Sequence, residues 1–441
     1  MRPVQLRIER VVYGGFGLAR SACAESDSQT TSFVPFTLPG ELVEATPSGP
    51  TNELKLVRVL EESSERVRCG CPYFGTCGGC HLQMASYPEQ LRIKEQVLRE
   101  SLTRAGVVEI PDIVQHAADQ WHYRNRIRLH VIRDDGTVRL GYRERASSSI
   151  LPINRCPIAA PILWRAAEVM LNAATHDADM RRSIEPSAEI EFFCNADMSR
   201  LQVTLLCTMV KQVSSTAFQY AFSRLQQDLP ELAGAGVLRI HPRTGQVQEE
   251  LASWGAPGLN YDVAGERHWV ARGGFFQVNR FLLPTMVELV CAGQQGHVAW
   301  DLYAGVGLFA RVLARTFGQV TAVEANPDAA RELASSLRRI GSQHRGVTAV
   351  IVDYLREVVL QRERPELIVL DPPRAGAGTE VCQLITQIAP QNIVYVSCDP
   401  VTLGRDLATL QPNYEIESLR LVDLFPQTYH QEAVVNLRRR S

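Results

Sequence analysis

The stretch HVAWDLYAGVG, from His297 to Gly307, decides the fold of the C-terminal part of the chain. Apolar residues run up to Asp301 as in a buried strand, and a glycine pair follows as in a turn that leads into a helix. Three further strands of this kind end at Glu324, Asp371 and Cys398. Alternating strands and helices predict a parallel sheet, whose ligands bind at the carboxyl ends of the strands. We therefore expect these four side chains to meet in one crevice.

The glycine pair has two interpretations. Followed by an acid at the end of the next strand, Glu324, it resembles the S-adenosylmethionine site of Rossmann-like methyltransferases, in which that acid would bind the ribose hydroxyls. However, Gly305-x-Gly307-x-x-Ala310 also satisfies the dinucleotide fingerprint, which would indicate an NAD-dependent dehydrogenase. The glycine motif alone leaves both interpretations open.

The two later strand ends favour the methyltransferase. The prolines after Asp371 stiffen a turn at the place where many methyltransferases of nucleic-acid bases carry Asp/Asn-Pro-Pro. The next residue, Arg374, stands where an aromatic is usual, which argues against methylation of an adenine amino group. Cys398 places a thiol, a candidate nucleophile, at the same crevice.

The remainder of the chain predicts two further units. Residues 1–61 contain short alternating strands broken by glycine and proline, as in an OB-like barrel. Residues 62–265 predict a mixed α+β unit, with helices near Ile162–Ala174 and Ala217–Gln227. The α/β unit occupies residues 266–441. We therefore expect a multidomain protein divided at these positions, with a helix over 86–106 that packs on the C-terminal domain.

The stretch CPYFGTCGGC, from Cys71 to Cys80, places three thiols within ten residues. Disulfides, zinc and an iron–sulfur cluster are the alternatives. The chain has no apolar run near the roughly 18 residues that cross a bilayer, and no apolar signal-type start. We therefore expect a cytoplasmic protein, in which disulfides are disfavoured. Zinc and iron–sulfur chemistry both remain open.

One segment is locally basic although the net charge of the chain is −2. Arg124, Arg126 and Arg128 alternate with other residues as along one face of a strand, and Trp121 and Tyr123 precede them. Arginine and aromatic side chains together suit RNA, through phosphate contacts and base stacking. The alternative is a solvated outer strand face.

Taken in chain order, these motifs resemble the RNA uracil-5-methyltransferase family over essentially the whole chain. The order is a TRAM-type barrel, CPYFGTCGGC, NRCPI at Asn154–Ile158, GGFFQVN at Gly273–Asn279, DLYAGVG, VEAN, DPPRAG, SCDP and FPQTYHQEAVV near the end. The combination is specific, whereas no single element is.

The resemblance implies a role for each matching position. Cys398 would add to carbon 6 of uracil as the nucleophile, and Glu432 would remove the proton from carbon 5. The positions that contact S-adenosylmethionine would be Gln277, Tyr303, Glu324 and Asp371. The C-x5-C-x2-C spacing and a later Cys-Pro would hold a 4Fe–4S cluster through Cys71, Cys77, Cys80 and Cys156.

The implied reaction is transfer of a methyl group from S-adenosylmethionine to carbon 5 of an RNA uridine. Members with both the barrel and the cluster commonly act on large-subunit ribosomal RNA, so we favour 23S rRNA over the transfer-RNA T-loop. We expect a monomer that does not bind membranes. An NAD-dependent iron–sulfur oxidoreductase and an inactive RNA-binding factor are the alternatives from other classes. Binding of S-adenosylhomocysteine or NAD, and turnover, would discriminate among the three.

Overall fold

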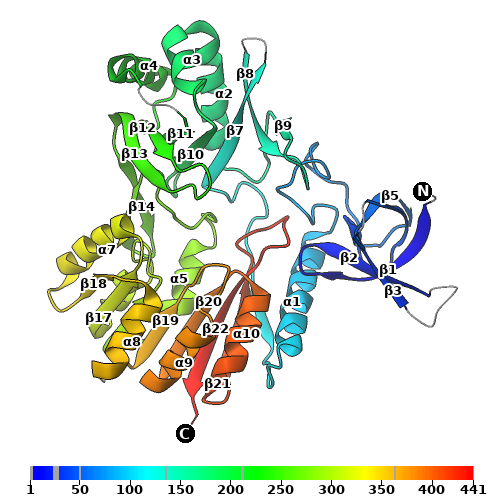
Figure 1. The fold of residues 1–441 in the computed structure, drawn as a ribbon, viewed down its shortest axis with the longest axis vertical. Coiled ribbons are helices and arrows are strands. Elements are labelled where there is room, and N and C mark those ends of the chain that lie inside the picture. The colour runs from blue at the N-terminus through cyan, green and yellow to red at the C-terminus, as the bar shows by residue number, and fades with distance from the viewer. Residues whose placement is uncertain are drawn as a thin grey trace.

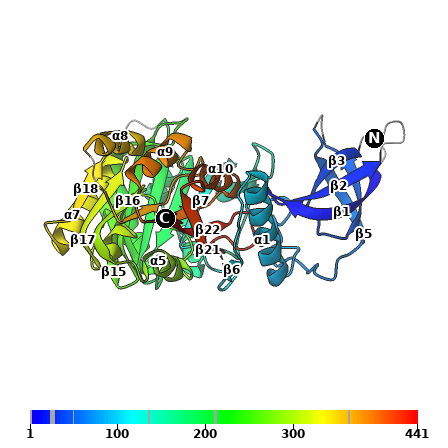
Figure 2. The ribbon, with the colours of Figure 1, turned by 90° about the horizontal axis from the view of Figure 1, so that it is seen from below.

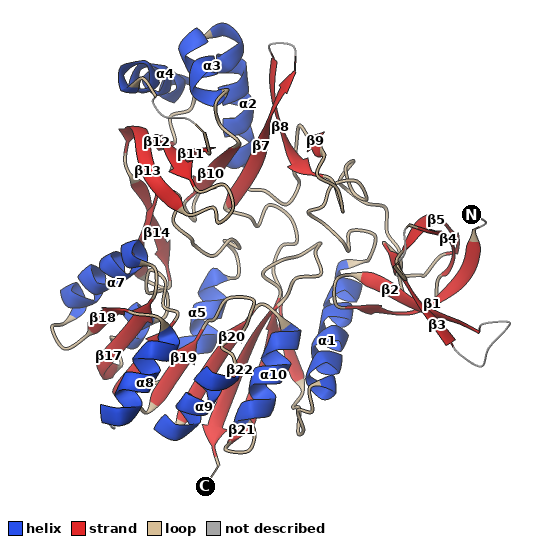
Figure 3. Cartoon of the chain, viewed as in Figure 1, coloured by secondary structure: helices blue, strands red, loops and turns tan. Residues whose placement is uncertain are grey.

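A computed structural model describes residues 3–22, 29–48, 51–134, 137–209, 213–361 and 364–440. Within these residues the strands form three sheets, of five, seven and eight strands, and one two-stranded hairpin (Figure 1). Helices lie against the central and the C-terminal sheet (Figure 3). None of the helices in these ranges has the length and apolar character needed to cross a bilayer.

The N-terminal sheet is antiparallel, with strand order β3-β2-β1-β4-β5. Its strands are β1 (Val4–Val12), β2 (Phe16–Ala22), β3 (Gln29–Pro35), β4 (Leu42–Pro47) and β5 (Leu54–Glu61). The sheet curls, because Phe33 of β3 forms a bridge to Glu53, immediately before β5. Alternate residues such as Leu6, Ile8 and Val43 are buried inside the curl. The β unit expected from the alternating pattern is confirmed as a curled antiparallel sheet.

The central sheet has strand order β13-β12-β11-β10-β7-β8-β9. Its strands are β7 (Arg126–Asp134), β8 (Thr137–Arg143), β9 (Ile150–Pro152), β10 (Glu189–Cys194), β11 (Leu201–Cys207), β12 (Leu232–Ile240) and β13 (Val247–Gly255). The helices α2 (Pro161–His176), α3 (Ala178–Ile184) and α4 (Ser215–Asp228) share an apolar core with it. The helices expected near Ile162–Ala174 and Ala217–Gln227 are thus confirmed as α2 and α4. The hairpin of β14 (Gly258–Val263) and β15 (Glu266–Ala271) leads to the C-terminal unit.

The C-terminal sheet has strand order β18-β17-β16-β19-β20-β22-β21-β6. Its strands are β16 (Gly296–Leu302), β17 (Phe317–Glu324), β18 (Arg345–Thr348), β19 (Leu367–Leu370), β20 (Asn392–Ser397), β21 (Tyr414–Val422), β22 (Glu432–Arg439) and β6 (Ile113–His116). The helices are α5 (Leu283–Cys291), α6 (Ala310–Leu313), α7 (Pro327–Ile340), α8 (Ile351–Gln361), α9 (Thr379–Ile388) and α10 (Pro400–Leu410). From β16 the chain proceeds to β17 on one side and later to β19 on the other, so the strand order reverses beside β16. In sheets of this kind, ligands bind at the carboxyl ends of the strands beside such a reversal.

The expectation of a parallel sheet is wrong for the last strand. β22 runs antiparallel to both β20 and β21, and it enters the sheet between them. It follows β21 through residues 423–431 without a crossover helix, and a connection of this kind joins antiparallel strands. The C-terminal unit is therefore a mixed α/β sheet.

Helix α1 (Tyr87–Arg104) connects the units. Ser86 caps its first turn, and Pro88 follows at a position that tolerates proline. Leu98 and Leu102 lie in the core of the C-terminal unit, whereas Ile93 packs with residues of the N-terminal sheet and the cysteine stretch. Figure 2 shows α1 between the N-terminal sheet and the C-terminal unit. β6, from the segment expected to be central, also pairs with β21, so both elements belong physically to the C-terminal unit.

Candidate active site and cysteine cavity

The glycine loop after β16 is held by two carboxylates. Asp301 is fully buried beneath it, and its Oδ2 accepts a hydrogen bond from the Ala310 amide at 2.8 Å. Glu324, at the end of β17, accepts from the Gly305 amide at 2.9 Å. Gly307 has φ +86°, and a Cβ there would lie 2.6 Å from Leu333. A side chain at position 307 would therefore be strained and would clash, which explains the need for glycine.

Three acids face this loop, and they repel one another. Burial raises the pKa of Asp301 to about 8, and the charges of Asp371 and Glu324 add to the effect. Burial also raises the pKa of Asp371 to about 7. Gln277 donates from Nε2 to Asp371 Oδ2 at 3.4 Å, so two predicted cofactor positions are in contact. Tyr303, directly after β16, has φ +65°, an uncommon backbone conformation for a residue with a side chain.

Cys398 and Glu432 lie side by side. Ser397, the last residue of β20, pairs with Ala433 of β22. Cys398 follows directly after β20, and Glu432 is the first residue of the antiparallel strand β22, so the two residues are neighbours across the pair of strands. Burial raises the pKa of the Cys398 thiol to about 12, and the negative charge of Glu432 adds to this. Burial also raises the pKa of Glu432 well above its ordinary value, with a further contribution from Asp371. The structure thus brings the two expected catalytic residues together beside the acids of the crevice.

Two residues at this site were not assigned a role from the sequence. Arg374, after the two prolines, lowers the pKa values of both Cys398 and Glu432 by its positive charge. Its Nη2 donates to His430 Nδ1 at 3.2 Å, and burial lowers the pKa of His430 to about 3, so this histidine is a neutral acceptor. The position of Arg374 directly after the two prolines could have indicated from the sequence that it lies at this site, whereas nothing in the sequence indicated His430.

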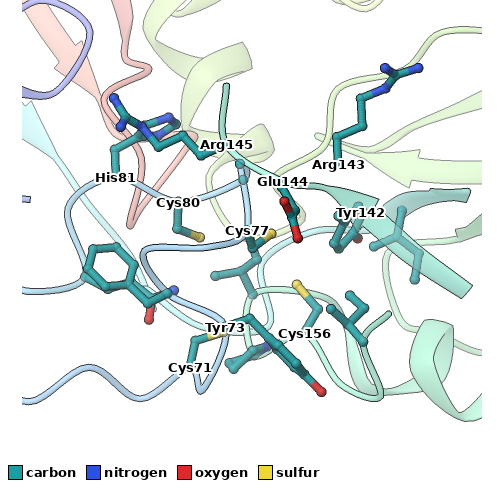
Figure 4. Close-up of a pocket in the computed structure, with 18 of the residues that line it drawn as sticks. Cys71, Tyr73, Cys77, Cys80, His81, Tyr142, Arg143, Glu144, Arg145 and Cys156 are labelled. Carbon is teal, nitrogen blue, oxygen red and sulfur yellow. The ribbon is translucent and has the colours of Figure 1, made fainter. Parts of the chain in front are cut away.

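The four expected metal ligands line one cavity of about 820 Å³ between the cysteine stretch and β7–β9 (Figure 4). Cys71, Cys77 and Cys80 come from one loop, and Cys156 comes from the other side of the cavity. The two sides are joined by hydrogen bonds. The Gly78 amide donates to the Arg143 carbonyl at 3.0 Å. The Tyr73 hydroxyl donates to Asn154 Oδ1 at 2.7 Å.

The four cysteines are partly exposed, and their sulfurs surround a shared space (Figure 4). Burial raises the pKa of Cys80 to about 12 and of Cys156 to about 11. In the part of the chain that the structure describes, no three Cys, His, Asp or Glu side chains converge closely enough to hold a single metal ion. The donor set is nevertheless four thiols, the complement that both zinc and four-iron clusters require.

The basic strand differs from the expectation. Arg126 donates to the Gly274 carbonyl at 2.6 Å and lies 3.7 Å from Glu191, and Arg128 pairs with the same glutamate at 2.9 Å. Two of the three expected RNA ligands therefore already have acidic partners from β10. Instead, Arg143 and Arg155 line the cysteine cavity, are exposed, and form no ion pair with any residue in the described ranges. Arg143 points away from the cysteines (Figure 4).

Comparison with known proteins gives a consistent result. Residues 346–440 match the family model tRNA (Uracil-5-)-methyltransferase. The chain is 30% identical to an RNA methyltransferase of Thermotoga maritima, with 98% of each chain covered. It is 31% identical to the 23S rRNA (uracil(1939)-C(5))-methyltransferase RlmD of Shewanella denitrificans, with 91% of this chain and 90% of the relative covered.

The fold is also similar to a solved structure. The tRNA (uracil-54, C5)-methyltransferase of Pyrococcus abyssi, crystallised with S-adenosyl-L-homocysteine, superposes with a TM-score of 0.73. The alignment covers 98% of this chain and 99% of that one at 21% identity. At this identity the likeness concerns the fold.

Proposed function

The chain belongs to the RNA uracil-5-methyltransferase family and is an RNA (uracil-5-)-methyltransferase, and from that premise we propose that it transfers a methyl group from S-adenosylmethionine to carbon 5 of a uridine in 23S rRNA. Membership of this family argues against the NAD-dependent oxidoreductase and the inactive RNA-binding factor. The observation that carries the mechanism is the adjacency of Cys398 and Glu432 beside an acidic crevice.

The charge of the crevice supports a sulfonium cofactor rather than a dinucleotide. Asp301, Glu324 and Asp371 interact through their charges near the glycine loop. A dinucleotide would bring a negatively charged pyrophosphate towards these carboxylates, whereas S-adenosylmethionine carries positive charge on sulfur and on its amino group. Glu324 and Asp371 are then cofactor-binding residues, together with Gln277 and Tyr303.

We assign the covalent chemistry to Cys398. Its sulfur forms a bond to carbon 6 of uracil, which makes carbon 5 an enolate carbon that can attack an electrophilic methyl group. S-adenosylmethionine supplies that group. The thiol releases its proton to solvent and adds as the thiolate, and the positive charge of Arg374 lowers the thiol's pKa and so favours that form. The target base has to leave its stack to expose carbon 6.

Glu432 completes the reaction as the base. After methyl transfer, carbon 5 bears both a methyl group and a hydrogen. Glu432 takes that proton, the carbon 5–carbon 6 double bond reforms, and the bond from carbon 6 to sulfur breaks. Its carboxyl group is almost fully buried, with 3% of the residue exposed, and burial raises its pKa, which makes the carboxylate a stronger base.

We also propose that Cys71, Cys77, Cys80 and Cys156 hold a 4Fe–4S cluster and that the N-terminal sheet is a TRAM-type RNA-binding barrel. The cavity supports the cluster, because all four cysteines line it and four thiolates are the ligand set that a 4Fe–4S cluster requires. All four irons would have a protein ligand, so the cluster's role is structural, and it fixes the central unit beside the RNA.

The preference for 23S rRNA rests on the relatives named for that substrate. The family model and the fold match are named for transfer RNA, so the T-loop uridine is the second candidate. The test is a map of 5-methyluridine in 23S rRNA and transfer RNA from cells with the gene, without it, and with the Cys398→Ala variant. Loss of one 23S rRNA position in the last two strains would support the proposal. Loss confined to transfer RNA would overturn the choice of substrate.

A further inference from the structure

One contact joins the N-terminal sheet directly to the turn that carries Cys398. Tyr13, in the turn after β1, donates from its hydroxyl to Asp399 Oδ2 at 2.6 Å. The two residues are 386 positions apart in the chain. Asp399 follows Cys398 and caps α10, because its Oδ1 accepts from the Val401 and Thr402 amides, each at 3.0 Å. Both carboxylate oxygens of Asp399 therefore accept hydrogen bonds, Oδ1 from the first turn of α10 and Oδ2 from the N-terminal unit.

We propose that Tyr13 is a positioning residue for methyl transfer, which orients Asp399 and through it the Cys398 nucleophile. The inference rests on the proposed function of Cys398. It gives the N-terminal sheet a part in the chemical step, in addition to any part in RNA binding.

The surroundings of Tyr13 keep its ring in place. The ring packs edge-on against Tyr429 with centroids 5.4 Å apart, and Tyr429 packs against His81 at 4.7 Å. The amides of His81 and Leu82 donate to the Gln427 carbonyl, at 2.9 and 3.0 Å. These contacts join the N-terminal turn, the end of the cysteine stretch and the loop before Glu432. A phenylalanine at position 13 would keep this packing and lose the hydroxyl alone.

The hydrogen bond also affects the charge near the nucleophile. The groups that act on Cys398 are Glu432 from β22, Arg374 and Asp371 from the turn after β19, and Asp399 beside it. The negative charge of Asp399 raises the pKa of the Cys398 thiol. The Tyr13 hydroxyl draws part of that charge towards itself, so its removal should make the thiolate less favourable.

The experiment compares Tyr13→Phe with the full-length wild type, and Tyr220→Phe is the matched control. Tyr220 is an exposed tyrosine on α4, so this control makes the same chemical change away from the site. Initial rates with S-adenosylmethionine and 23S rRNA from cells lacking the gene give kcat and both KM values. Alkylation of the Cys398 peptide by iodoacetamide, followed across pH by mass spectrometry, gives the apparent thiol pKa without requiring turnover.

Tyr13→Phe should lower kcat roughly tenfold, as expected for one charge-assisted hydrogen bond, and leave both KM values within about twofold. The alkylation profile should move to higher pH, whereas Tyr220→Phe should match the wild type. Asp399→Asn, and the double variant that carries both Tyr13→Phe and Asp399→Asn, complete a double-mutant cycle. The double variant should have about the same kcat as Asp399→Asn alone. An unchanged kcat and alkylation profile, additive effects in the cycle, or a change confined to the KM for RNA would overturn the inference. Wild type that forms no 5-methyluridine would instead refute the proposed function.

Discussion

Replacement of Asp301 by asparagine should stabilise the protein at high pH. Asp301 is fully buried beneath the glycine loop. Its Oδ2 accepts from the Ala310 amide, and its Oδ1 has no hydrogen-bond partner among the described residues. Asparagine has nearly the same shape and can accept the same bond, but it cannot ionise.

The magnitude follows from the raised pKa. Burial raises the pKa of Asp301 from 3.8 to about 8. Below pH 4 the carboxyl is protonated in the folded and the unfolded chain, so it has no effect on stability. Between pH 4 and 8 the unfolded chain ionises first, and stability falls as the pH rises. The full loss is at most roughly 6 kcal/mol, from about 1.4 kcal/mol for each pH unit between the two pKa values.

The assay is urea unfolding of wild type and Asp301→Asn at pH 5 and pH 8. The advantage of the variant should grow by several kcal/mol between these values. Asp353→Asn, which changes an exposed acid on α8, is the control and should show no such growth. An advantage that does not grow with pH would refute the reasoning about the buried charge.

Three further predictions concern the cofactors and the RNA surface. Serine in place of Cys71, Cys77, Cys80 or Cys156 should remove iron and the broad absorption near about 400 nm from protein purified without oxygen, and stoichiometric zinc in the wild type would contradict the cluster. S-adenosylhomocysteine at about 100 times its Kd should stabilise the protein by roughly 2.7 kcal/mol in thermal unfolding, whereas NAD at the same concentration should not. The double variant Arg143→Ala, Arg155→Ala should lower the slope of log K for RNA binding against log salt concentration by about two counterions, whereas the control Arg182→Ala should leave it unchanged. An unchanged slope in the double variant would show that neither arginine contacts the RNA.

The sequence was most informative about the crevice. Asp301, Glu324 and Asp371 do interact, because the carboxyl ends of neighbouring parallel strands meet at one edge and each strand was recognisable alone. That Cys398 and Glu432 act together could be predicted only from the family resemblance, because the local sequence pattern does not show that the last strand enters the sheet antiparallel to β20. The expected convergence of the strand ends is confirmed, whereas the expected parallel sheet is interrupted by the antiparallel strand β22.

Contacts between distant segments were beyond local reasoning. Arg126 and Arg128 looked like a free basic face, but the neighbouring strand β10 supplies Glu191 to both of them. The partner of Tyr13 lies 386 residues away, and it depends on how the N-terminal sheet meets α10. Strand periodicity shows which residues share a face, but it does not show which other strand or unit faces them.

The most direct test of the central claim is mass spectrometry of the Glu432→Gln variant after incubation with S-adenosylmethionine and its RNA. The account predicts a denaturant-stable complex in which the peptide containing Cys398 is bonded to a uridine that already carries the new methyl group, because the proton on carbon 5 can no longer be removed. Cys398→Ala should give neither a complex nor methylated RNA. Normal turnover by Glu432→Gln, or a complex attached to any residue other than Cys398, would contradict the account.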